Sequence, residues 1–197
     1  KYFERFVAKI VDELGAHFRY VITINEPQVY AFESYSKGNW PPAHVSKREA
    51  LKVLGNCIRA HNRVAKAIKQ SSRKFQISMA YNIAHVYAGD DARLSEMSAH
   101  IVDFANNHYI LKRTIKSCDF IGLNYYFSDR IYGYRTHNPN EYQSDLGWDM
   151  QPSDIRRVIE ELHDRYNKPV FVTENGLADA NDSRRQWWLK QTLEALS

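Results

Sequence analysis

Residues 20–27 read YVITINEP, and residues 169–176 read PVFVTENG. Each stretch is a short apolar run, rich in β-branched side chains, that stops at a glutamate. A continuous apolar run of this length predicts a strand of a parallel sheet that is buried on both faces. Similar runs cover about residues 75–81 and 119–124, so we expect four such strands.

Segments with helical periodicity precede and separate these strands. We expect helices over residues 2–14, from Ser46, over residues 92–115 with a break near Asn106, from Pro152 to about Tyr166, and from Ser183. The alternation predicts an α/β fold with a parallel sheet and right-handed crossovers. Either a doubly wound sheet or part of an eight-stranded barrel fits this pattern.

The composition is that of one folded domain over residues 1–197. Hydrophobic residues make up 44% and charged residues 25%, which excludes wholesale disorder. We expect a long polar loop over residues 128–151.

The net charge of +4 comes from scattered basic residues, so we expect no nucleic-acid partner. Cys57 and Cys118 stand far apart, which favours a reducing, cytoplasmic location over a disulfide scaffold. No apolar run reaches the roughly 18 residues of a membrane span.

Polar residues directly follow three of the four predicted strands. They are Asn25 and Glu26, Asn124 and Tyr126, and Glu174. In a β/α barrel the carboxyl ends of the strands converge on one pocket. Two glutamates there would form a carboxylate pair, which suits glycoside hydrolysis because one carboxyl protonates the leaving oxygen and the other attacks the sugar.

Each of these motifs also has a structural explanation when taken alone. Residues 25–27 have the composition of a helix N-terminus, with Pro27 in the first turn. Residues 174–176 could form a glycine turn, and Asn124 could be a core amide. Their joint occurrence, each after an apolar strand, favours the catalytic interpretation.

At these positions the chain resembles family 1 of the glycoside hydrolases. Residues 22–27 resemble the acid/base motif T-x-N-E-P of that family, and residues 173–176 resemble its nucleophile motif T-E-N-G. Residues 119–126 resemble its sixth strand. The resemblance implies a (β/α)8 TIM barrel, of which this chain would be an incomplete part covering strands four to seven. Both chain ends fall inside helical patterns, which agrees with an incomplete part.

The resemblance also implies a role for each site residue. Glu26 would be the acid/base and Glu174 the nucleophile of a retaining β-glucosidase. Asn25 would bind the sugar 2-hydroxyl, Tyr126 would donate a hydrogen bond to Glu174, and Asn124 would line the pocket. His61 is expected to be a core or supporting residue. No cofactor and no metal are implied, and the partner would be a β-glycoside or oligosaccharide.

Several sugar-binding residues of the family, including the arginine beside the nucleophile, have no counterpart here. We therefore expect weak or no activity from this chain alone, and self-association or a complementary half-barrel covering its open sheet edges. Two alternative functions remain. One is a non-catalytic carbohydrate-binding or scaffold module of the same fold, and the other is a related endo-acting barrel glycosidase.

Overall fold

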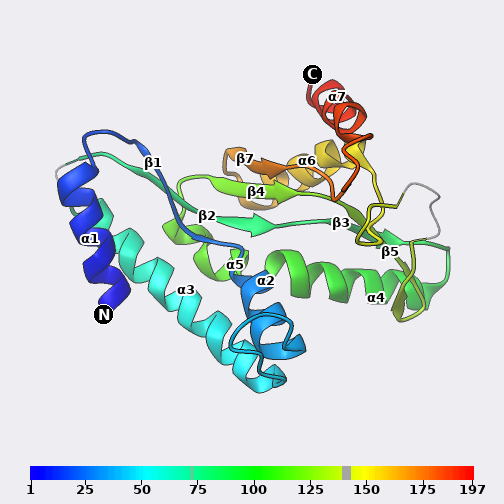
Figure 1. The fold of residues 1–197 in the computed structure, drawn as a ribbon, viewed down its shortest axis with the longest axis horizontal. Coiled ribbons are helices and arrows are strands. Elements are labelled where there is room, and N and C mark those ends of the chain that lie inside the picture. The colour runs from blue at the N-terminus through cyan, green and yellow to red at the C-terminus, as the bar shows by residue number, and fades with distance from the viewer. Residues whose placement is uncertain (72, 139–142) are drawn as a thin grey trace. The chain divides into compact units, whose positions relative to one another are not determined.

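The computed structural model describes residues 1–71, 73–138 and 143–197. The chain divides into two compact units, each with helices and strands (Figure 1). The first unit consists of Lys1–Tyr81 and Ile110–Gly122, and the second consists of Asn82–Tyr109 and Leu123–Ser197.

The first unit begins with α1 (Tyr2–Leu14), β1 (Tyr20–Asn25) and α2 (Pro27–Ala31), followed by a π-helical turn η1 (Phe32–Lys37). It continues with α3 (Lys47–Lys69) and β2 (Gln76–Asn82), and it ends with α5 (Leu111–Thr114) and the 3₁₀ turn η3 (Ile115–Ser117). α1 ends at Gly15, and the amide of Glu49 donates to the Ser46 hydroxyl at the start of α3.

The apolar faces of α1 and α3 pack on each other and on β2, as the side-by-side helices of Figure 1 show. The buried residues of this core are Val11, Val64, Ala65, Ile68, Phe75 and Ile77. β1 and β2 pair in parallel, with Tyr20 opposite Gln76. The core therefore supports β1, whose carboxyl end at Asn25 leads directly into α2.

The second unit contains β3 (His85–Ala88), α4 (Arg93–Asp103), the π-helical turn η2 (Phe104–His108), β5 (Ser128–Tyr132) and β6 (Arg135–Thr136). It ends with the 3₁₀ turn η4 (Pro152–Asp154), α6 (Ile155–Tyr166), β7 (Val170–Asn175) and α7 (Arg185–Leu196). β4 (Ile121–Tyr125) starts in the first unit and finishes in the second. The core of the second unit includes Leu123, Tyr125, Ile155, Leu162 and Trp188.

The four predicted strands form one sheet in the order β1-β2-β4-β7. The central strand β4 is buried along its whole length, as is β2 apart from its two end residues, as expected for a parallel sheet. The prediction of complete burial is wrong for β1 and β7. Tyr20 is 51% exposed and Val172 is 40% exposed, because each lies on an outer strand of the sheet.

The predicted loop over residues 128–151 is wrong over part of its length. β5 and β6 pair antiparallel within it, and β5 pairs in parallel with β3, which makes a second, three-stranded sheet. β5 and β6 are short and rich in polar residues, so their composition resembles that of a loop. Residues 139–142 of the predicted loop lie outside the described residues.

The helical predictions are confirmed with three refinements. The break expected near Asn106 is a π-helical turn, η2, which separates α4 from α5. The predicted helix from Pro152 starts as a 3₁₀ turn and continues as α6 to Tyr166. The last helix, α7, begins at Arg185, two residues after the position predicted. Among the described residues, no helix is long and apolar enough to cross a membrane.

Candidate functional site

Glu26 directly follows β1 and has an unusual backbone conformation. Its φ of 43° and ψ of 55° lie in the left-handed region, which costs a non-glycine residue roughly 1–2 kcal/mol. Two backbone hydrogen bonds hold it there: its amide donates to the Ala80 carbonyl at 2.9 Å, and its carbonyl accepts from the Tyr30 amide at 3.1 Å. Strain of this kind is concentrated at functional sites.

Glu26 also precedes α2, whose first residue is Pro27. The structural explanation for residues 25–27 is therefore correct for the backbone, since a short helix does begin there. It does not explain the side chain, because the Glu26 carboxylate makes no capping hydrogen bond to α2. The side chain of Glu26 is therefore not the cap of α2.

A β-bulge precedes this turn. Ile22 lies opposite Ser78 and Asn25 lies opposite Ala80, so β1 advances three residues while β2 advances two. A bulge redirects the side chains that follow it, and bulges are frequent beside active sites. Asn25 is the last residue of β1, and its side chain follows this bulge together with that of Glu26.

Glu174 lies near the carboxyl end of β7, in the second unit. Its carboxylate accepts a hydrogen bond from the Tyr126 hydroxyl, whose residue directly follows β4. Tyr126 in turn lies against the Trp148 ring, with 6.2 Å between ring centroids. The structure thus brings Tyr126 to Glu174, as the resemblance implied.

The residues on either side of Glu174 are fixed by β4. Thr173 donates from its hydroxyl to the Asn124 side-chain oxygen at 2.7 Å, and the Asn175 amide group donates to the Tyr125 carbonyl at 3.0 Å. Asn124 is completely buried. Its contact with Thr173 gives it a supporting position beside the nucleophile candidate, and its contact with substrate stays a prediction.

Trp188 is a supporting residue that the sequence did not reveal. It is completely buried on α7, its indole N–H donates to the Asn175 side-chain oxygen at 2.9 Å, and its ring stacks on Tyr125. A tryptophan within a helix is most simply explained as an ordinary core residue, so no sequence signal separates the two roles. Together Trp188 and Asn175 anchor the turn that follows Glu174.

His61 lies in the core of the first unit, as expected, and is completely buried on α3. One ring nitrogen, Nδ1, lies 2.7 Å from the Thr23 hydroxyl of β1, and the other, Nε2, lies 3.4 Å from the Cys118 sulfur. Burial, together with the positive charge of Lys69, lowers the pKa of His61 to about 4. The imidazole is therefore neutral at pH 7. Cys57 and Cys118 are both free thiols.

One cluster in the second unit has the composition of a metal site. Asp103, His108 and Glu161 place three potential ligand atoms within 4.8 Å of one another. However, a cation of the protein already lies against these groups, because the Arg165 guanidinium is 3.1 Å from the Glu161 oxygen that His108 contacts. Burial alone would lower the pKa of His108, but its hydrogen bonds to the two carboxylates outweigh burial and raise it. We therefore interpret the cluster as an ion-pair network.

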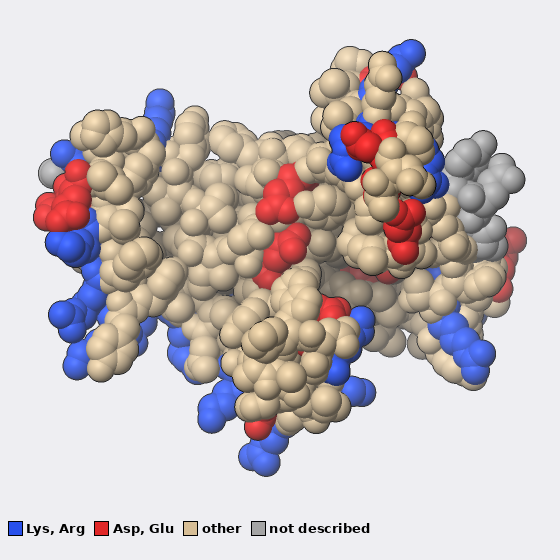
Figure 2. Space-filling view, in the orientation of Figure 1, with Lys and Arg blue, Asp and Glu red and all other residues tan. Residues whose placement is uncertain are grey.

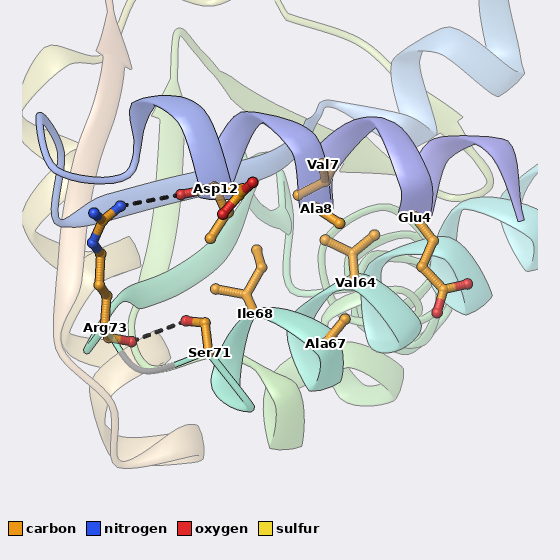
Figure 3. A pocket seen from close by; sticks show the side chains of 10 residues that line it. Glu4, Val7, Ala8, Asp12, Val64, Ala67, Ile68, Ser71 and Arg73 are labelled. Carbon is orange, nitrogen blue, oxygen red and sulfur yellow. Dashed lines mark hydrogen bonds between the residues drawn. The ribbon is translucent and has the colours of Figure 1, made fainter.

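The first unit also has a cavity between α1 and α3, of about 310 Å³ (Figure 3). Its floor is apolar, with Val7, Val64 and Ile68, while Glu4, Asp12 and Arg73 stand at its sides. None of its lining residues comes from the end of a strand. This cavity is therefore not the candidate active site.

The surface charge is distributed as the composition suggested. Among the described residues on the face in Figure 2, Lys and Arg side chains occur singly or in small groups and form no continuous basic stripe. Nucleic-acid surfaces concentrate such charge on one face or along one helix.

The sequence matches the model of glycosyl hydrolase family 1 over residues 1–113 and 102–193. The chain belongs to glycosyl hydrolase family 1. Curated relatives within the family include a β-galactosidase of Sulfolobus acidocaldarius, 27% identical over 95% of this chain and 44% of the relative. Beta-glucosidase A of Thermotoga maritima is 21% identical over 90% of this chain and 48% of the relative.

Solved structures of the family share the fold. A beta-glycosidase from Pyrococcus horikoshii superposes with a TM-score of 0.87 at 25% identity, over 99% of this chain and 51% of that chain. A beta-glucosidase from Thermotoga maritima, at 19% identity, superposes with a TM-score of 0.90 over 99% of this chain and 54% of that chain. The chain thus has the α/β fold of part of the family 1 TIM barrel, and it spans about half the length of these relatives.

Proposed function

We propose that this chain carries the catalytic pair of an enzyme that hydrolyses terminal β-D-glycosidic bonds, a β-glucosidase that retains the anomeric configuration. Residues 1–197 would be part of one (β/α)8 catalytic domain. The observation that carries the proposal is the hydrogen bond from Tyr126 to Glu174 at the carboxyl end of β7, in a chain of glycosyl hydrolase family 1.

In the first step, the Glu174 carboxylate attacks the anomeric carbon and the bond from that carbon to the leaving oxygen breaks. Glu26, protonated, gives its proton to the leaving oxygen. In the second step, the Glu26 carboxylate takes a proton from water as the water oxygen attacks the same carbon, and Glu174 is released. Retention requires the two carboxyl groups to work at a separation of roughly 5–5.5 Å.

The supporting roles follow from the contacts of each side chain. The hydroxyl of Tyr126 favours the ionised form of Glu174 and fixes its orientation, since a hydrogen bond to a carboxylate favours its charged form. Asn25, next to Glu26, would bind the sugar 2-hydroxyl. Asn124 would line the pocket from β4, where Thr173 already orients its side chain.

Two substitutions test the assignment of the two glutamates. Because we expect weak or no activity from residues 1–197 alone, they are made in a chain that carries the complete barrel. Glu174→Gly should abolish turnover of an aryl β-glucoside, and added azide should restore it by attacking the anomeric carbon in place of the missing carboxylate. Glu26→Ala should slow substrates with poor leaving groups far more than those with good ones, because only poor leaving groups need the proton. The same behaviour of both variants on every substrate would contradict the proposal.

The sugar specificity is the finer part of this proposal. Relatives carry the names β-glucosidase and β-galactosidase, and each name applies to that relative alone. We favour glucosides, and comparing hydrolysis of 4-nitrophenyl β-glucoside with that of the galactoside decides the point. Activity on polymeric glucan but not on disaccharides would instead support an endo-acting glycosidase. We also propose a cytoplasmic location, because both cysteines are free thiols and the cytosol keeps thiols reduced.

A further inference from the structure

A buried hydrogen-bond chain links α3 to β1 inside the first unit. The Thr23 hydroxyl lies 3.3 Å from the Ser78 carbonyl and can only donate there, because a carbonyl oxygen only accepts. That hydroxyl has a single hydrogen. The contact of 2.7 Å between Thr23 and His61 must therefore run from His61, whose Nδ1–H donates to the Thr23 oxygen.

The other ring nitrogen completes the same direction. With its hydrogen on Nδ1, a neutral His61 has only a lone pair on Nε2, which accepts from the Cys118 thiol at 3.4 Å. The low pKa of His61 agrees with this neutral form. The hydrogen bonds therefore all run in one direction: Cys118 donates to His61, His61 donates to Thr23, and Thr23 donates to the Ser78 carbonyl.

Thr23 occupies the β-bulge that precedes Glu26. The bulge lies between Ile22 and Asn25, and Thr23 is its first residue. Glu26 follows three residues later in its left-handed conformation, held to β2 by the hydrogen bond from its amide to Ala80. A strained backbone persists only where its surroundings over-determine it, so the anchor at the bulge bears on the conformation of Glu26.

We propose that His61 is a positioning residue for Glu26, acting through its hydrogen bond to Thr23 to hold the β-bulge of β1. The proposal rests on the proposed function only for the catalytic meaning of Glu26. The mechanical link from α3 to the end of β1 consists entirely of contacts inside one unit. His61 itself makes no contact with substrate in this scheme.

Amide hydrogen exchange of the 197-residue chain, measured by NMR, tests the link. The probe is the Glu26 amide, which donates to the Ala80 carbonyl of β2. The reference is the Ile77 amide, also of β2, which donates to the Asp119 carboxylate. His61→Leu and Thr23→Val remove the hydrogen bond at either end while keeping side-chain size. Each should accelerate exchange at Glu26 about tenfold relative to Ile77, the effect of losing one hydrogen bond.

Matched variants separate positioning from general stability. His61→Asn places an amide donor where Nδ1 stood, and Thr23→Ser keeps the hydroxyl, so both should retain slow exchange at Glu26. Cys118→Ala removes the partner on the far side of the ring and should also leave Glu26 unchanged. Equal acceleration at Glu26 and Ile77, no acceleration, or acceleration by His61→Asn as large as by His61→Leu would overturn the proposal. If His61→Leu does not fold, the Thr23 pair decides.

A kinetic comparison, made in a chain that carries the complete barrel, adds the catalytic readout. In His61→Leu, hydrolysis of a phenyl β-glucoside should fall more than hydrolysis of a 2,4-dinitrophenyl β-glucoside, and His61→Asn should restore the ratio. Equal loss on both substrates would overturn positioning of the acid. If Glu26→Ala itself shows no dependence on the leaving group, the proposed function fails, while the exchange result still decides the link to Glu26.

Discussion

The two candidate catalytic residues sit in different local environments. The position of Glu26 is fixed through its backbone, which is left-handed and hydrogen-bonded to β2. The position of Glu174 is fixed through its side chain, which accepts a hydrogen bond from Tyr126. A retaining mechanism needs the two carboxyls in different protonation states, and different environments are how proteins achieve that. A change at Tyr126 should therefore act on Glu174 alone.

Tyr126→Phe should lower the hydrolysis of a 2,4-dinitrophenyl β-glucoside by about tenfold, because it removes one hydrogen bond to a charged group. The exposed Tyr134, 77% accessible, offers the control Tyr134→Phe, which should leave the rate unchanged. Because Tyr126 does not act on the leaving group, the loss should be similar for phenyl and dinitrophenyl substrates. An undiminished rate in Tyr126→Phe would argue against Glu174 as nucleophile.

His61 makes stability depend on pH in a defined direction. Its pKa is about 4 in the folded chain, below the value of about 6.5 for an unperturbed histidine. Between about pH 6.5 and pH 4, His61 is protonated in the unfolded chain but neutral in the folded chain. The free energy of unfolding therefore falls as the pH drops through this range, by up to roughly 3 kcal/mol. Urea unfolding across this range should show a smaller fall for His61→Asn, which does not titrate. Parallel curves for the two proteins would refute the assignment.

At the level of elements, two glycines give opposite predictions. A Cβ on Gly122 of β4 would lie 2.6 Å from the Met79 carbonyl oxygen, so Gly122→Ala should destabilise the chain by about 2 kcal/mol. A Cβ on Gly55, inside α3, would meet only the flexible end of Arg59 at 3.4 Å. Gly55→Ala should stabilise by up to about 1 kcal/mol. Urea midpoints of both variants against the parent measure this, and an equal shift would contradict the close approach of β4 to β2.

The elements that were predictable are those with strong local signals. Apolar runs located β1, β2, β4 and β7, and helical periodicity from Ser46 located α3. The three-stranded sheet was not predictable, because β3 and β5 pair across some forty residues of chain and each is short and half polar. The β-bulge in β1 was hidden for a similar reason, since an unbroken apolar run carries no sign of an extra residue.

The sequence was enough to name candidate site residues, but not the residues that support them. Glu26, Glu174 and Tyr126 stand in motifs, and the contact between the last two was implied by resemblance. The partners that fix the neighbouring backbone, Trp188 and His61, are buried side chains on helices. Their roles depend on tertiary contacts, which a single sequence does not contain.

At the level of the whole molecule, the outer strands of the sheet determine behaviour in solution. Tyr20 and Ile22 of β1, and Phe171 and Val172 of β7, are each more than a third exposed. Exposed apolar strands at a sheet edge favour pairing with another chain. We expect light scattering to give a mass above that of a 23.1 kDa monomer, with Val172→Lys lowering it. A monomer at all concentrations would contradict this.

The most direct test of the proposed chemistry is mass spectrometry after treatment with 2,4-dinitrophenyl 2-deoxy-2-fluoro-β-glucoside. The fluorine slows release of the glycosyl group, so a nucleophile that attacks the sugar stays labelled. We predict one fluoroglucosyl group on the peptide that contains Glu174, absent in Glu174→Gln and present, formed with the same good leaving group, in Glu26→Ala. A label on another residue, or no label on Glu174 in a chain that carries the complete barrel, would contradict its role as the nucleophile.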